Sequence, residues 1–142
     1  MSEIDEVVGA QSAEQVQSIV NCAVAVGYAD GGFDGGERRE LSDALMTLLS
    51  GHREWVQGYI QNALQTAQTS SADEIYEEAA GQLDEDGCEA CVVVAAAIIS
   101  KSGGIGASEG VALQALSNAL GIEAGSQHYM KLLGQGMTMA RS

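Results

Sequence analysis

The sequence contains no proline, only 4% aromatic residues, and six Lys and Arg residues in total. With a hydrophobic fraction of 46%, the absence of proline argues against a disordered tail or a proline-rich linker. The shortage of aromatic residues leaves Ala, Val, Leu and Ile as the main apolar residues, which favours close helix–helix packing over a β-sandwich or barrel. The 142 residues fit one domain, residues 1–142, that is large enough to bury a core.

The shortage of basic residues bears on the class of ligand. Phosphate contacts depend on clustered Lys and Arg, so we expect neither nucleic acid nor an anionic membrane surface as a ligand. The net charge is −14, and residues 73–89 alone carry eight acids and no base. Cations, basic protein patches and simple solubility remain as explanations of this acidity.

Segments for targeting or membrane insertion are not visible. The N-terminal stretch lacks the apolar region of a secretory signal, and the longest apolar run, Cys91 to Ile99, is too short to span a bilayer. Three cysteines, an odd number, do not suggest a disulfide framework. We therefore expect a cytoplasmic protein that does not insert into a membrane.

Apolar residues at helical spacing predict an all-α bundle of about seven helices. The run CVVVAAAII is apolar on every side, which predicts a helix at the centre of the bundle. Gly121 predicts a helix end. Pairs with the spacing of a capping box include Ser12 with Gln15, Ser71 with Glu74, and Asp86 with Glu89. The expected helices cover about residues 13–29, 36–49, 52–68, 72–82, 87–101, 108–120 and 126–139.

The sequence also contains an internal repeat. A shift of 72 residues lays GGFDGGE (31–37) on GGIGASE (103–109) and pairs Ala23 with Ala95. Two helix–loop–helix repeats, about 13–69 and 86–139, would pack around a pseudo-twofold axis, with an acidic helix at about 72–82 between them.

The strings AVAVGYADGGFDGGERRELSDAL and VAAAIISKSGGIGASEGVALQALSNALGI resemble the paired motifs of the TerB-like, tellurite-resistance-associated family, A-x-x-x-A-x-A-D-G-x-[IV]-x-x-x-E. The resemblance covers about residues 13–135. It implies an all-helical fold of about seven helices, a cytoplasmic location, and metal chelation by the acidic loop in a stress-response assembly near membrane-associated protein partners. The second motif departs from the pattern, because Ser102 replaces the aspartate and only Glu109 is kept.

The stretch DGGFDGGE (30–37) is the candidate metal site. Asp30, Asp34 and Glu37 would bring carboxylate oxygens, the ligands that Ca²⁺ and Mg²⁺ prefer, to one loop. It is not an EF-hand, since Gly32 and Leu41 stand where two principal ligands belong.

Part of this stretch has a second explanation. Asp34 and Glu37 have capping-box spacing at a helix start, so capping alone accounts for them. Asp30 lies at the C-terminal end of a helix, where the macrodipole disfavours a carboxylate. A weakly bound cation nearby would explain that position.

The acidic helix offers a candidate partner-binding site. Asp73, Glu74, Glu77 and Glu78 lie on one helix face, which is either a solvated surface or the docking site of a basic protein partner.

No catalytic set can be assembled from the sequence. Cys88 and Cys91 form CEAC at a helix N-terminus, where a thiolate is favoured, but a redox or zinc site would need further context. His52 and His128 have no nucleophile or acid at recognisable spacing. We expect no enzyme.

Two hypotheses remain. In the first, the protein is a TerB-like adaptor that binds Ca²⁺ or Mg²⁺ weakly at Asp30, Asp34 and Glu37. In the second, it is a metal-independent interaction module whose acidic surface docks a basic partner. The oligomeric state stays open in both.

Overall fold

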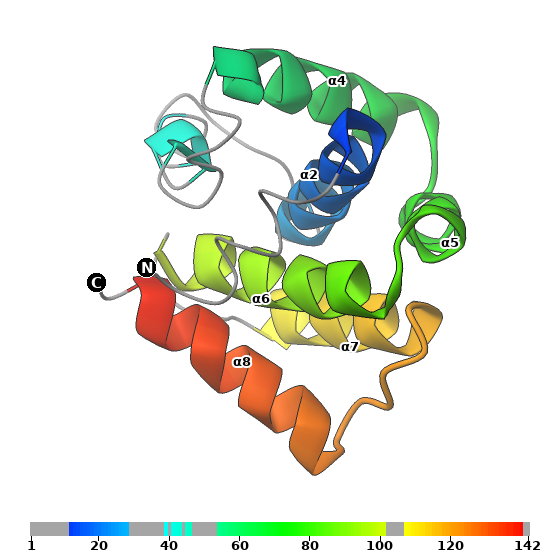
Figure 1. Cartoon of the computed structure of the whole chain (residues 1–142), viewed down its shortest axis with the longest axis vertical. Helices are drawn as coiled ribbons and strands as arrows, with labels where there is room; N and C mark the ends of the chain where they lie inside the picture. Colours follow the sequence, from blue (N-terminus) through cyan, green and yellow to red (C-terminus); the bar gives the residue numbers. More distant parts are fainter. Residues whose placement is uncertain are drawn as a thin grey trace.

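The computed structural model describes residues 12–28, 39, 41–43, 45–46, 54–101 and 107–140. Within these ranges every regular element is a helix and none is a strand, which confirms the all-α prediction (Figure 1). The described residues between 39 and 46 are helical and lie inside the range predicted for the second helix. The six bounded helices are α2 (Ala13–Gly27), α4 (Val56–Thr69), α5 (Ala72–Gln82), α6 (Glu85–Lys101), α7 (Ala107–Ala119) and α8 (Gln127–Ala140).

Two helices begin at predicted capping boxes. At the start of α2, the Gln15 N–H donates to Ser12 Oγ at 3.2 Å, and the Ser12 N–H donates to Gln15 Oε1 at 2.8 Å. At the start of α5, Ser71 and Glu74 exchange the same two hydrogen bonds at 3.2 and 3.0 Å. Because these bonds satisfy backbone N–H groups that have no helical partner, they fix where each helix starts.

The predicted end of α7 at Gly121 is also confirmed. Gly121 has a φ of 83°, a conformation that glycine adopts without a steric penalty. Its N–H donates to Asn118 O at 3.1 Å, and the Ile122 N–H donates to Ser117 O at 2.9 Å. This pair of bonds is a Schellman motif, which turns the chain toward α8.

The predicted cap of α6 is wrong by two residues. Asp84, not Asp86, caps the helix, and its Oδ1 accepts from the Gly87 N–H at 2.7 Å. With Asp84 as the cap, the buried residues Leu83 and Cys88 occupy the two positions of a hydrophobic staple. The acids that follow Asp84 then lie in the first turn, where the helix macrodipole favours them.

The start of α4 also differs from its prediction. Residues 54 and 55 form a short 3₁₀ turn, and the α-helix begins at Val56. Trp55 occupies the cap position and provides no side-chain hydrogen bond. Without a capping side chain nearby, the sequence carried no signal for this boundary.

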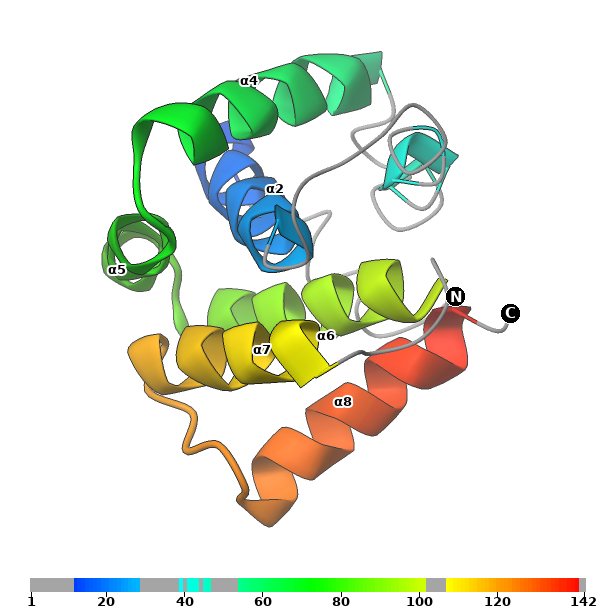
Figure 2. The same cartoon turned by 180° about the vertical axis from the view of Figure 1, so that it is seen from behind.

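Helix α6 lies at the centre of the fold, as its apolar run predicted. Every residue from Cys91 to Ile99 is buried, with at most 4% of its surface exposed. Figure 1 shows α2 and α4 on one side of α6 and α8 on the other, and Figure 2 shows α7 running beside it. None of the described helices is both long enough and apolar enough to cross a lipid bilayer.

Helices α6 and α8 approach closely at Gly136. A Cβ atom added to this glycine would lie 2.6 Å from Val93 O and 2.7 Å from Ala96 Cβ. Both positions belong to the buried centre of α6, where neither backbone nor core atoms can shift without disturbing other contacts. The missing side chain at Gly136 therefore sets the distance between the two helices.

We expect Gly136→Ala to lower the free energy of unfolding by about 1–3 kcal/mol, because the new methyl group overpacks the contact between α6 and α8. Gly134→Ala is the matched control on the same helix. Its added Cβ would meet nothing within 4 Å, so better helix propensity should raise stability by up to about 1 kcal/mol. Urea unfolding of both variants measures the difference. Equal stability of the two variants would contradict the close packing at Gly136.

Candidate binding site

The predicted cation ligands Asp30, Asp34 and Glu37 lie outside the described residues. Helix α2, which precedes them, ends at Gly27 with Tyr28 as its C-cap, and its last turn contains no basic residue. Among the residues that the structure describes, no group of three or more His, Cys, Asp or Glu side chains could hold a metal ion.

The four acids predicted on α5 share its outer face. Asp73, Glu74, Glu77 and Glu78 are all exposed. The opposite face of the helix is buried through Ile75, Tyr76 and Ala79. The structure therefore brings the four predicted partner-binding residues together on one solvent-facing surface.

Glu74 differs from the other three acids because it also holds the helix cap. Its carboxylate accepts from the Ser71 backbone N–H, and this bond, with a smaller effect from the Ser71 hydroxyl, lowers the pKa of Glu74. Asp73, Glu77 and Glu78 make no such bond in the described structure, so they are the acids on α5 that remain for a partner.

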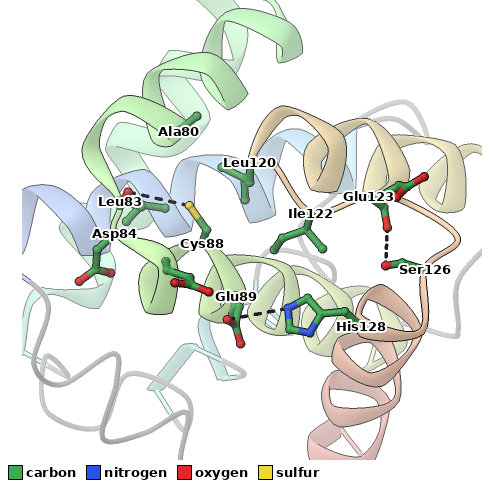
Figure 3. Close-up of a pocket in the computed structure, with 12 residues that line it drawn as sticks. Ala80, Leu83, Asp84, Cys88, Glu89, Leu120, Ile122, Glu123, Ser126 and His128 are labelled. Carbon is green, nitrogen blue, oxygen red and sulfur yellow. Dashed lines mark hydrogen bonds and ion pairs between the residues drawn. The ribbon is translucent and has the colours of Figure 1, made fainter.

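A pocket of about 590 Å³ lies where the α5–α6 turn meets the connection between α7 and α8 (Figure 3). We call it the α6 pocket, because α6 begins at its edge. Its floor is apolar and its rim is acidic, and this combination suits a ligand that is both cationic and partly aliphatic. The lining residues are Ala80, Leu83, Asp84, Glu85, Cys88, Glu89, Leu120, Gly121, Ile122, Glu123, Ser126 and His128.

Local hydrogen bonds hold the connection between α7 and α8 in place. The buried Ser117 hydroxyl donates to Ile122 O at 2.6 Å, and the Ser126 hydroxyl donates to Glu123 O at 2.7 Å. Ser126 Oγ also accepts from the Tyr129 N–H at 3.1 Å, which caps the start of α8. The rim of the α6 pocket on the side of the α7–α8 connection is therefore held in place by hydrogen bonds within the connection itself.

The ion pair in the α6 pocket joins His128 and Glu89. His128 Nε2 lies 3.8 Å from Glu89 Oε2, and the two side chains are 50% and 30% exposed. At this distance and exposure the pair contributes little to stability. It leaves Glu89 available to a stronger cationic partner.

The α6 pocket could not be predicted from the sequence. Its residues come from two segments, 80–89 and 120–128, which no sequence spacing connects. Gly121 and the acids after Leu83 were recognised as helix-end signals. Nothing in them indicates that the two helix ends meet in space.

The surroundings of Cys88 and Cys91 differ from those that CEAC at a helix N-terminus suggested. Burial, assisted by nearby acidic groups, raises the pKa of Cys88 to about 11, so the thiolate expected at the helix N-terminus is not favoured. Cys91 is fully buried, and the Cys22 thiol beside it, together with burial, holds the pKa of Cys91 well above its usual range. All three thiols are unpaired.

We expect the alkylation rate of Cys88 in the native protein to keep rising with pH beyond the usual thiol pKa of about 8.5, toward about 11. Because the pKa of Cys88 is raised, its thiol stays neutral at neutral pH. Only the small fraction present as thiolate reacts there. Iodoacetamide labelling followed by peptide mass spectrometry measures the rate at each cysteine. The denatured protein is the control, and a native rate that levels off near the usual thiol pKa would contradict the structure.

No family model, no curated protein and no solved structure matches the chain. The TerB-like resemblance accordingly stays a prediction.

Proposed function

We propose that the protein is a non-enzymatic interaction module that docks a basic segment of a protein partner on its acidic surface. The observation that supports this is the placement of the eight acids in residues 73–89. Seven of them are exposed and Glu89 is half-buried, and they follow one another along α5, the turn after it and the first turns of α6. None of these carboxylates is enclosed in the core.

The charge of this surface is not balanced locally. The segment 73–89 contains no Lys or Arg, and within the described residues its ion pair is the weak one between Glu89 and His128. A concentrated negative field of this kind raises the encounter rate with a positively charged partner, and salt screens it. A cationic partner would also relieve the repulsion among the acids.

We also propose that the protein has the doubled, TerB-like fold that the sequence resemblance implies. A shift of 72 residues carries Ala13–Gly27 onto residues 85–99 of α6, and it carries Val56–Thr69 onto residues 128–141, which overlap α8. Helix α2 packs on α4 as α6 packs on α8, and α2 also contacts α6. We infer that the fold is a doubled helical unit. The three unpaired thiols fit a reducing, cytoplasmic setting.

Binding of a short, fluorescently labelled lysine-rich peptide tests the proposed function. Glu77→Lys should weaken binding about fivefold, the equivalent of about 1 kcal/mol, because it replaces an attractive charge with a repulsive one. Glu54→Lys makes the same change of charge at an exposed position outside the segment 73–89 and should have a smaller effect. Fluorescence anisotropy measures both affinities.

Two results would contradict the interaction module. One is an equal loss of affinity in the two variants, which would show that only net charge matters. The other is a loss of binding on addition of a chelator, since docking through carboxylates and lysine side chains requires no metal. Raising the salt concentration should weaken binding to the unmodified protein.

A weak Ca²⁺ or Mg²⁺ site at Asp30, Asp34 and Glu37 remains a second candidate function. The observation that favours it is the end of α2, whose last turn has no basic residue to offset the negative end of the helix macrodipole. A cation held just beyond Tyr28 would supply that missing positive charge. The protein would then act as a cation-responsive adaptor in a stress-response assembly.

Titration of the protein with Ca²⁺ or Mg²⁺, followed by amide NMR, tests this second candidate. Saturable shifts should be confined to residues 29–37 and their immediate neighbours, and they should disappear in Asp30→Asn. Glu54→Gln removes one negative charge elsewhere and should leave them unchanged. Shifts spread evenly over all acidic surfaces would rule out a discrete site.

A further inference from the structure

The floor of the α6 pocket is suited to an aliphatic chain. It is formed by side chains that are at least nine-tenths buried, among them Leu83, Leu120 and Ile122. In Figure 3 these side chains and Cys88 face the same hollow. Methylene groups laid on this floor would leave water without giving up a hydrogen bond.

The negative charge of the α6 pocket has two independent sources. The first is the set of rim acids, of which Glu85 and Glu89 are contributed by the first turns of α6, and Glu123 stands on the opposite rim. The second source is backbone. The C-terminal ends of α5 and α7 both reach the pocket, through Leu83 and through Leu120, and neither helix has a basic residue in its last turn.

Helix ends of this kind favour a cation, because their last carbonyl groups carry partial negative charge. The N-terminus of α6 also reaches the pocket and has the opposite polarity. Its partial positive charge is already offset by the carboxylate of the Asp84 cap. The net preference of the site is for a positive charge above an apolar floor.

The lining residues favour an ammonium group over a guanidinium group. A guanidinium is planar and commonly stacks on an aromatic ring, and the α6 pocket has no Phe, Tyr or Trp among its lining residues. An ammonium group is compact and donates three hydrogen bonds in different directions. The carboxylates of Glu85 and Glu89, one turn apart on α6, can each accept one of these bonds.

His128 occupies the place that such an ammonium group would take beside Glu89. Its Nε2 lies 3.8 Å from the carboxylate, which is too long for a strong hydrogen bond. Lysine, with its charge on a four-carbon stem, would approach Glu89 more closely while its stem covers the floor. The weak ion pair is therefore a replaceable contact.

We propose that the α6 pocket receives one lysine side chain of the docked partner, with its stem on Leu83 and Ile122 and its ammonium group between Glu85 and Glu89. The inference rests on the proposed function, because the lysine belongs to the basic segment that the acidic surface docks. It adds a specific anchor to an interaction that would otherwise depend on diffuse charge.

The test is an NMR titration of the full chain with N-acetyl-lysine methylamide. Shifts are expected at the amides of Cys88, Glu89 and Ile122. The arginine analogue should bind more weakly, and the norleucine analogue, which has the apolar stem without the charge, should not bind. Glu85→Gln/Glu89→Gln should weaken binding of the lysine analogue about tenfold, as expected for the loss of charge-assisted hydrogen bonds.

Two variants sharpen this experiment. Glu77→Gln/Glu78→Gln removes the same charge from α5, outside the α6 pocket, and should leave the affinity for the lysine analogue nearly unchanged. His128→Lys places a competing ammonium group beside Glu89 and should abolish the shifts. Amide spectra of each variant confirm that it folds.

Several results would overturn the lysine pocket. Equal losses in the two glutamine double variants, or equal binding of the lysine and arginine analogues, would overturn the lysine pocket. Tighter binding of cadaverine than of the lysine analogue would reassign the site to free amines. If the lysine-rich peptide still binds normally to Glu85→Gln/Glu89→Gln but loses affinity in Glu77→Lys, the interaction module stands and the lysine pocket fails.

Discussion

Burial of α6 on all sides is the constraint on which the other helices depend. The residues from Cys91 to Ile99 have no polar face to turn toward water, so neighbouring helices must cover the whole circumference. Helices α2, α7 and α8 provide this cover. Small residues allow it at short range, because Ala96 and Gly136 let the axes of α6 and α8 approach closely. The all-α architecture follows from one apolar segment that has to be enclosed.

Local signals in the sequence were sufficient for most helix boundaries. The hydrogen bonds of Ser12 and Ser71 join residues three positions apart, so they can be read from spacing alone. Gly121 is likewise a local signal. The start of α6 was misjudged because Asp84 and Asp86 are both acceptable caps. The choice between them depends on the burial of Leu83 and Cys88, which is a tertiary contact.

The candidate site was predictable only in part. Exposure of Asp73, Glu77 and Glu78 follows from the helical period, which also puts Ile75 and Ala79 on the buried face. The α6 pocket required knowledge of which helix ends meet, and that depends on how α5 and α7 pack around α6 and α2. Cys88 shows the same limit, since its position at a helix N-terminus indicates a thiolate while its burial favours the neutral thiol. The sequence shows which charged groups and helix ends lie near Cys88 along the chain, but it does not show how far the thiol is shielded from water.

The position of α2 in the chain has a consequence for synthesis on the ribosome. Ten of its fifteen residues are buried, and its partners α4, α5, α6 and α7 all follow it in the sequence. Helix α6 begins only at Glu85, long after Gly27 ends α2. While the chain is being made, the apolar surface of α2 has no complete cover until α6 has left the exit tunnel. Nascent chains that end before Glu85 thus expose the apolar surface of α2, and stable folding has to wait until α6 has been made.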